Sequence, residues 1–338
     1  MVAIATTSNH PWRGLLVAPA LALGVLGCGS SPAAAPLDRA TTTTAPTTTA
    51  APTSTTASTT TLAPTTTTTI PEPLAVALTG RPRAAADPVG LAAQLTAAEQ
   101  AIRNPATAPD VVAAAGHLQQ VAYRQLGIHP EWDAEVMARL PPEVVEPASL
   151  NVQSRREFRS MHVRLRDTLP AWRIVAPEPA PVLLALYQEA AATFGVGWEY
   201  LAAINLVETG LGRIRGTSVA GAQGPMQFMP ATWAAYGAGG DINSTRDSIM
   251  AAARYLAANG FANPGGIDGA LFAYNRHPAY VRGVAAIARV IELDPQAFAG
   301  YYHWEIYYLT TMGDVLLPVG YEATAAIPVA DYLAAHPQ

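Results

Sequence analysis

The sequence contains no lysine and only one cysteine. All 20 basic residues are arginine, and 25 acidic residues outnumber them, so the formal net charge at pH 7 is −5. A chain without a clustered basic surface does not favour nucleic acid as a partner. The single cysteine, Cys28, excludes an internal disulfide and indicates another use for this thiol.

Long apolar runs are also missing, although 50% of the residues are hydrophobic. No stretch reaches the roughly 20 consecutive apolar residues that cross a bilayer as a helix. Much of the apolar content is alanine in amphipathic patterns. The 338 residues are therefore expected to fold around a sizeable core, in one large or two small domains.

Residues 1–27 have the pattern of a lipoprotein signal peptide. Arg13 is the only charge in this segment, and the apolar stretch 14–26 is too short to span a membrane. Val25-Leu26-Gly27-Cys28 resembles the lipobox of bacterial lipoproteins, in which the cysteine is lipidated. The resemblance implies a lipid anchor at Cys28, which places the chain in the cell envelope, on the outer face of the cytoplasmic membrane. An ordinary signal peptide with a chance cysteine is the alternative.

Residues 28–74 are predicted to be a disordered Thr/Pro-rich linker. From Thr41 to Thr69, 18 of 29 residues are threonine, and no charge interrupts them. Such a segment cannot bury a core. As a spacer of this length it would reach about 140 Å if extended like polyproline and roughly 40 Å as a flexible coil.

The rest of the chain is predicted to be mainly α. Residues 84–172 show amphipathic stripes without catalytic motifs, the last of them over 155–166, and indicate an N-terminal helical subdomain. A lysozyme-like domain is expected over 175–300. Only 315–319 resembles a strand. The aromatic C-terminal extension, 301–338, is expected to pack on the helices rather than to extend a sugar-binding groove.

Helix ends are marked by capping residues. Asp87 is predicted to cap one helix, Ser244 or Thr245 a second, and Asp268 a third. Gly195 is predicted to end a helix. These positions fix where the loops between the helices lie.

The helix 198–208 is apolar nearly all round and ends in one carboxylate, Glu208. Burial disfavours the ionised carboxyl, and the negative end of the helix dipole acts in the same direction. A carboxyl with a raised pKa keeps its proton near neutral pH and can act as a general acid. Taken alone, however, a glutamate that simply reaches solvent is the commoner interpretation.

A glycine-rich loop follows Glu208 and leads into Gly224-Pro225-Met226-Gln227-Phe228-Met229-Pro230. Glycine permits close approach of a ligand to the backbone. The Gln227 amide offers a donor and an acceptor, which suits sugar hydroxyls and amides. This context favours a catalytic role for Glu208.

These motifs together resemble the transglycosylase (SLT) domain of lytic transglycosylases, glycoside hydrolase family 23 and its relatives, with a goose-type-lysozyme-like fold. The resemblance covers about 175–295 and indicates an actinobacterial-type lipoprotein. The matching segments, in the order the family has them, are Glu208-Thr209, Ser218-Val219-Ala220-Gly221-Ala222, Gly224 to Pro230, and Ala273-Tyr274-Asn275.

The resemblance implies that Glu208 is the catalytic acid and base and that no metal or organic cofactor takes part. The implied substrate-binding residues are Thr209, Ser218, Gln227, Met229, Tyr274 and Asn275. In the family reading Ser218 lies near Glu208, Tyr274 hydrogen-bonds at the catalytic centre, and Asn275 positions the N-acetyl group. Gln227 and Met229 line the groove.

Two positions depart from the family's pattern. Thr209 replaces the usual serine and keeps its hydroxyl, but its branched carbon restricts the rotamer. Pro225 replaces leucine and removes a backbone donor. Both are expected to alter the shape of the groove rather than the activity.

The expected substrate is the glycan strand of peptidoglycan, and the expected reaction follows from the number of carboxylates. Ordinary glycosidases use two, about 5–5.5 Å or about 6.5–9.5 Å apart, whereas substrate-assisted enzymes need one. Because Glu208 is the single convincing acid, we predict the reaction of the family. It is a non-hydrolytic cleavage of the β-1,4 bond after N-acetylmuramic acid that forms a 1,6-anhydro product. The protein is expected to be a monomer.

Two alternatives remain open. A hydrolytic, lysozyme-like muramidase would need Asp241 or Asp247 as a second acid, and a catalytically silent wall-binding lipoprotein would need neither. The alternating residues from Asp241 to Asp247 also resemble a calcium loop. Arg246 and Ala252 occupy the positions that require glycine and glutamate, so helix capping is favoured.

Overall fold

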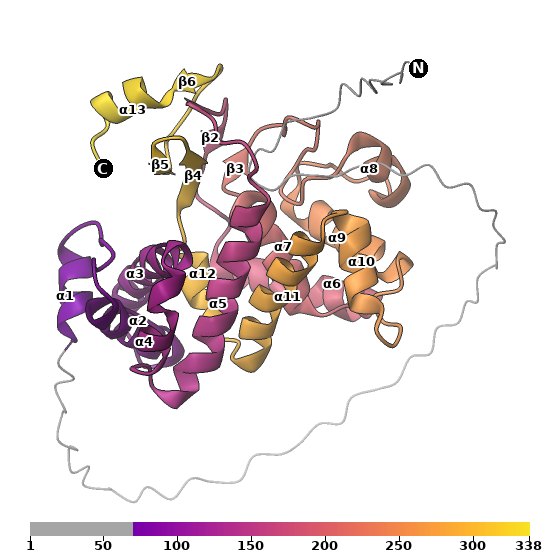
Figure 1. Cartoon of the computed structure of the whole chain (residues 1–338). Helices are drawn as coiled ribbons and strands as arrows, with labels where there is room; N and C mark the ends of the chain where they lie inside the picture. Colours follow the sequence, from indigo (N-terminus) through magenta and orange to yellow (C-terminus); the bar gives the residue numbers. More distant parts are fainter. Residues whose placement is uncertain (1–69) are drawn as a thin grey trace, which may run out of the picture. The chain divides into compact units, whose positions relative to one another are not determined.

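The computed structural model describes residues 70–338, and Pro71–Gln338 belong to one compact unit. The signal peptide, Cys28 and nearly all of the predicted linker lie outside the described residues. Within 70–338 the chain forms 13 α-helices, one 3₁₀ turn and six short strands, so the mainly α fold is confirmed (Figure 1). None of these helices combines the length and the apolar character needed to cross a lipid bilayer.

The first helices are α1 (Glu72–Thr79), α2 (Pro88–Arg103), α3 (Pro109–Ile128), the 3₁₀ turn η1 (Pro130–Trp132), α4 (Asp133–Met137) and α5 (Pro142–Ser160). Asp87 caps α2 as predicted, because its Oδ1 accepts a hydrogen bond of 2.9 Å from the Gly90 N–H. The predicted helix over 155–166 is wrong. Pro142 starts α5 much earlier, since proline fits the first turn of a helix, and α5 ends at Ser160.

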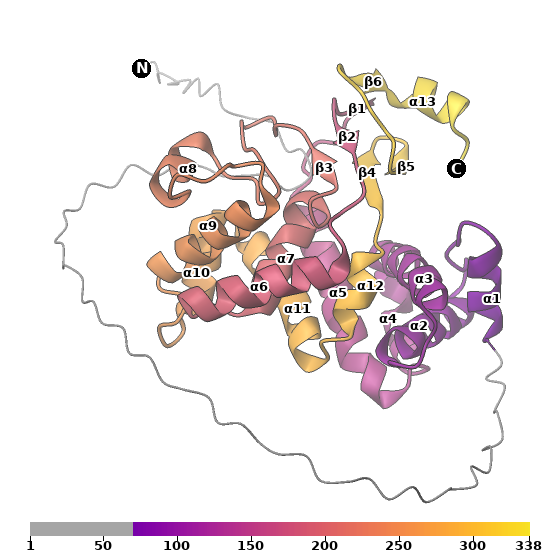
Figure 2. The same ribbon diagram turned by 180° about the vertical axis from the view of Figure 1, so that it is seen from behind.

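The next helices are α6 (Ala180–Phe194), α7 (Trp198–Thr209), α8 (Pro230–Tyr236), α9 (Thr245–Ala258), α10 (Gly266–Tyr274), α11 (Pro278–Leu293) and α12 (Ala297–Tyr302). Helix α7 packs against α6, α9 and α11, and α11 also packs along α5 (Figures 1 and 2). The apolar residues 201–204 of α7 are consequently buried in the largest core. This arrangement makes α7 the central helix, as the sequence predicts.

The caps of this second group agree with the sequence at two places and differ at one. Gly195 ends α6 in the left-handed conformation with φ of 66°, and Ser244 caps α9 by accepting from the Asp247 N–H. Asp268 does not cap α10, because the helix already begins at Gly266 after the left-handed Gly265. Glycine adopts this conformation without steric cost, and the helix therefore starts earlier than the side-chain pattern indicates.

The strands form three antiparallel pairs, which lie together with α13 (Val329–Ala335) at one side of the helices in both views (Figures 1 and 2). The pairs are β1 (Thr168–Leu169) with β6 (Ile327–Pro328), β2 (Arg173–Ile174) with β3 (Ile214–Arg215), and β4 (Ile306–Thr310) with β5 (Gly313–Leu317). The expected strand at 315–319 thus exists as β5. Both β5 and its partner β4 lie within the C-terminal extension, 301–338.

The aromatic side chains of the extension are mostly buried, in agreement with the expectation that they pack. Tyr301 donates a 2.6 Å hydrogen bond to Asn151 of α5, and the Tyr308 ring lies edge-on to Trp172. Strand β4 alternates buried and half-buried residues, which is typical of a strand with one covered face. The extension therefore joins segments from 166–174 in a small core of its own.

Candidate active site

The candidate catalytic residue lies where the central helix stops. Helix α7 ends at Thr209, and Gly210 reverses the chain in the left-handed conformation with φ of 60°. Glu208, in the last turn, is only 7% exposed. Since the residues before it are apolar and surrounded by other helices, its carboxyl is held inside the protein.

The two oxygens of the Glu208 carboxyl have different surroundings. Oε1 accepts a 2.8 Å hydrogen bond from the Tyr280 hydroxyl of α11. Oε2 is buried and has no hydrogen-bond partner within residues 70–338. Burial of an unpaired oxygen costs most when the carboxyl is ionised, so the protonated form is favoured in the absence of substrate. The geometry thus leaves one carboxyl oxygen available for proton transfer.

Burial raises the pKa of Glu208 to about 8, and the Tyr280 hydrogen bond opposes this shift only partly. A carboxyl in the interior loses the hydration that stabilises its charge. Glu208 is therefore mostly protonated at neutral pH. The direction is the one that the buried helix predicts, and it suits a general acid.

Tyr280 is a residue that sequence reasoning missed. The predicted tyrosine, Tyr274, donates instead to the Met226 carbonyl at 2.7 Å, and its ring is parallel to that of Tyr280 with centroids 6.4 Å apart. The one available signal was the position of Tyr280 beside Val281 and Val284 on the apolar face of a predicted helix. That pattern indicates burial but not a contact with Glu208.

The loop after α7 is fastened to the helix through one carbonyl. Thr209 and Asn205 both donate to the Pro225 carbonyl oxygen, at 2.6 and 2.9 Å, and Thr209 Oγ1 accepts from the Gly212 N–H. Thr209 is fully buried. It therefore supports the loop from inside, in place of the direct contact with substrate that the resemblance implies.

Gly224 lets this loop pass close to the segment before α9. Its φ is 74°, and a Cβ atom at this position would lie 1.9 Å from the Ile242 carbonyl oxygen. No side chain fits there without moving the backbone. The glycine of the sequence motif is thus required by packing, independently of any ligand.

Three of the predicted substrate-binding residues meet around a small hollow. Gln227, Met229 and Tyr274 line a cavity of about 30 Å³. Gln227 adopts φ of 51° and donates from Nε2 to the Gly224 carbonyl, which fixes its side chain. The structure therefore brings these three residues together.

The remaining two predicted binding residues lie at other points of the loop system. Ser218 accepts a 2.9 Å hydrogen bond from the Ala222 N–H and closes a turn. Asn275 follows α10 and is 2% exposed, and its Nδ2 is buried without a partner. Asn275 therefore has an unused donor, and the Ser218 oxygen already accepts one local hydrogen bond.

The two aspartates that a hydrolytic mechanism would need serve the loop before α9. Asp241 Oδ1 accepts from the Asn243 N–H at 2.9 Å, and Asp247 Oδ2 accepts from the Asp241 N–H at 3.0 Å. Within the described chain, burial and Tyr280 account for the pKa of Glu208, with no contribution from a second carboxylate. Both aspartates thus have local structural partners.

Replacing Tyr280 by phenylalanine is expected to move the alkaline limit of activity to higher pH. The hydrogen bond stabilises the ionised carboxyl, so its loss raises the pKa of Glu208 further. The pH profile of activity measures this shift. Tyr187→Phe is the control, because it removes a buried tyrosine hydroxyl that bonds to Asn205 of α7 and not to Glu208. Equal profiles for the two variants would contradict the role of Tyr280.

Comparison with known proteins agrees with the motifs. Residues 215–270 match the Transglycosylase SLT domain family. A stretch of 129 residues, 36% of this chain, is 33% identical to the membrane-bound lytic murein transglycosylase F of Thiobacillus denitrificans and covers 27% of that protein. No solved structure matches. The predicted resemblance to the SLT transglycosylases is confirmed over the matched residues.

Proposed function

We propose that this protein is a lytic transglycosylase of peptidoglycan in which Glu208 is the single catalytic acid and base. The observation that carries the proposal is the buried carboxyl with a pKa of about 8 and one oxygen without a partner. At neutral pH this group holds a proton that it can donate to a glycosidic oxygen. The SLT match and the relative's name as a murein transglycosylase support peptidoglycan as the substrate.

The proposed reaction uses the same carboxyl twice. Glu208 donates its proton to the oxygen of the β-1,4 bond between N-acetylmuramic acid and N-acetylglucosamine, and that bond breaks. The N-acetyl oxygen of the muramic acid takes the place of a second carboxylate. Glu208, now ionised, takes the proton of the sugar's 6-hydroxyl, whose oxygen closes the 1,6-anhydro ring. The carboxyl ends protonated, and water is not consumed.

Tyr280 helps in the intermediate state of this reaction. Its hydroxyl donates to Glu208 Oε1, and such a bond is stronger when the acceptor is ionised. The contact therefore stabilises the carboxylate that remains after the first proton transfer. Oε2 stays free to receive the second proton.

We propose that Gln227, Met229, Tyr274 and Asn275 bind the sugars around the cleaved bond. Asn275 is favoured as the partner of the N-acetyl carbonyl because its buried amide donor is unused. Ser218 is proposed to shape the groove through the turn that it closes.

Analysis of the digestion products tests the reaction. Purified peptidoglycan is incubated with the protein, and the fragments are identified by mass spectrometry. Fragments ending in 1,6-anhydromuramic acid, one water lighter than reducing ends, are the expected result. Reducing ends alone would instead favour the hydrolytic muramidase, with Asp241 or Asp247 assisting water.

We also propose that the chain works from the membrane surface. The lipobox-like sequence at Cys28 would carry the anchor, and the threonine-rich linker to residue 74 would let the domain reach the wall. The relative's name as a membrane-bound enzyme is consistent with this location. Incorporation of a labelled fatty acid, lost in Cys28→Ala, is the expected result.

A further inference from the structure

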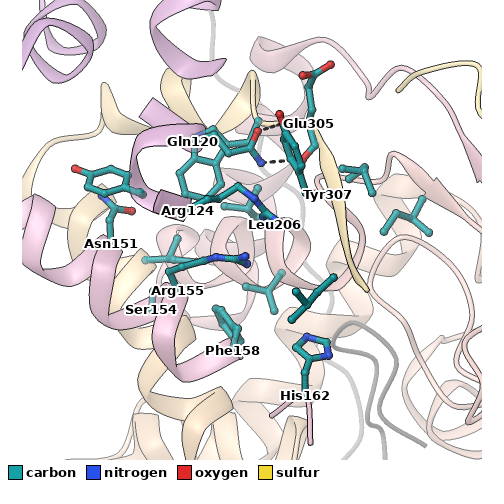
Figure 3. Close-up of a pocket in the computed structure, with 18 of the residues that line it drawn as sticks. Gln120, Arg124, Asn151, Ser154, Arg155, Phe158, His162, Leu206, Glu305 and Tyr307 are labelled. Atoms are coloured by element: carbon teal, nitrogen blue, oxygen red, sulfur yellow. Dashed lines mark hydrogen bonds between the residues drawn. The ribbon is translucent and has the colours of Figure 1, made fainter. Parts of the chain in front are cut away.

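A second and larger cavity of about 180 Å³ borders the end of the central helix (Figure 3). One wall is formed by Leu206 and Val207 of α7 and by Gly210, which follows the helix. Leu206 and Val207 are only partly buried, unlike most of the residues before them. Helices α3, α5 and α11 and strands β3 and β4 contribute to the other walls. None of the predicted site residues lines this cavity.

Two arginines project into the cavity and share one acid. Arg124 of α3 and Arg155 of α5 contact Asp314 Oδ2 at 2.5 and 2.9 Å. The Arg124 guanidinium also lies 4.3 Å from the centre of the Tyr307 ring. The Nε atoms of both arginines are buried and lack a hydrogen-bond partner. One carboxylate thus serves two groups that can each bind a carboxylate through two donors.

The positive charges around the cavity outnumber the carboxylates that pair with them. Arg159 is a further cation near Asp314. His162 also lines the cavity, and its pKa is lowered by burial and by the positive charges of Arg155 and Arg159. The acid on the far wall, Glu305, is attracted by Arg213. Burial of guanidinium groups without enough counter-charge is unfavourable. An anion in the cavity would relieve this imbalance.

Two aromatic side chains, Phe158 and Tyr280, lie between the cavity and Glu208. Phe158 lines it and lies edge-on to Tyr280 with ring centroids 6.3 Å apart, and Tyr280 bonds to Glu208. Trp172 lines it and also a neighbouring hollow, which includes Thr217 and Val219 on either side of Ser218. The cavity wall is therefore separated from the Glu208 carboxyl by the side chains of Phe158 and Tyr280.

We propose that the cavity binds a carboxylate of the peptide stem carried by the muramic acid beside the cleaved bond, with Arg124 and Arg155 as its partners. The proposal rests on the proposed function, since the stem belongs to the same substrate. The apolar walls would cover the peptide, and the exposed parts of the two guanidinium groups would meet the carboxylate. A purely apolar ligand would leave the excess positive charge of the two arginines uncompensated.

Calorimetric titration with a free stem tetrapeptide tests the site without catalysis. The same peptide with amidated carboxyl groups is the second ligand. The protein is expected to bind the free acid at least about tenfold more tightly, because charge-assisted hydrogen bonds are lost on amidation. Equal binding of the two peptides would overturn the proposal.

Two variants distinguish the contribution of the arginine charges to peptide binding from the contribution of the cavity volume. Arg155→Leu leaves Arg124 and Asp314 as a balanced pair, and is expected to remove the preference for the free acid. Leu206→Trp fills the cavity but keeps both arginines, and is expected to weaken binding of both peptides. Arg139→Leu, at an exposed arginine paired with Glu135, is the matched control and should bind like the unchanged protein.

The variant Glu208→Gln tests the peptide site independently of the proposed transglycosylase activity. It is expected to bind the tetrapeptide with unchanged affinity while releasing no fragments. If the unchanged protein binds the peptide through its carboxylates but cleaves nothing, the proposed function fails and the peptide site remains. If it cleaves peptidoglycan but Arg155→Leu prefers the free acid as before, the peptide site is wrong and the enzyme remains.

Discussion

Replacing Glu208 by glutamine is expected to lower the release of fragments from peptidoglycan by about 10²–10⁴-fold, the usual contribution of general acid and base catalysis. Glutamine keeps the size and the hydrogen-bonding capacity of the side chain but has no proton to transfer. Because the native carboxyl is mostly protonated at neutral pH, the substitution changes little else in its surroundings. The initial rate of fragment release from purified peptidoglycan is the measurement.

Glu199→Gln is the matched control for this experiment. Glu199 occupies the first turn of the same helix, α7, and is half-buried, so the substitution has the same chemistry in the same element. Its rate is expected to equal that of the unchanged protein. Equal rates for the Glu208 variant as well would favour the catalytically silent, wall-binding alternative.

Glu208→Gln is also expected to be more stable than the unchanged protein, by a margin that grows with pH. The carboxyl has a pKa of about 8 when folded, against an ordinary value of 4.5. Below 4.5 it is protonated in both states and the two proteins differ little. Between these values the unfolded chain loses the proton that the folded chain keeps, so the native protein loses about 1.4 kcal/mol of stability per pH unit. Above about 8 the difference is constant.

Urea unfolding of both proteins across this pH range measures the effect. The difference in the free energy of unfolding should reach several kcal/mol at its alkaline limit. A difference that stays the same at every pH would contradict the raised pKa of Glu208. The opposite slope would mean that Glu208 has a cationic partner, which the described structure does not contain.

The central part of the fold could be predicted because its signals are local. Asp87 and Ser244 cap helices through their own side chains within three residues, and Gly195 ends α6 by its left-handed conformation. The apolar sequence of α7 is sufficient to indicate a buried helix that ends at Glu208. Such signals need no knowledge of the rest of the chain.

The missed features depend on contacts between distant segments. Tyr280 and Glu208 are 72 residues apart, and nothing near Tyr280 indicates which carboxyl it meets. Strand β4 was not predicted because its tyrosines and Ile306 suit a buried strand and a packed loop equally well, and its partner β5 decides between them. The second cavity likewise combines Arg124, Arg155 and Asp314 from three elements.

The end of α7 has a consequence for the order in which the protein can fold during synthesis. Gly210 lies against Ile306 of β4, with no room for a Cβ atom between them. Gln120 of α3 exchanges two hydrogen bonds with the backbone of Glu305, drawn as dashed lines in Figure 3, and β1 pairs with β6. These contacts close only after residues up to 328 have emerged. The helices can form earlier, but a chain interrupted before that point is expected to lack the support that β4 gives to the end of α7 at Gly210, and to be inactive.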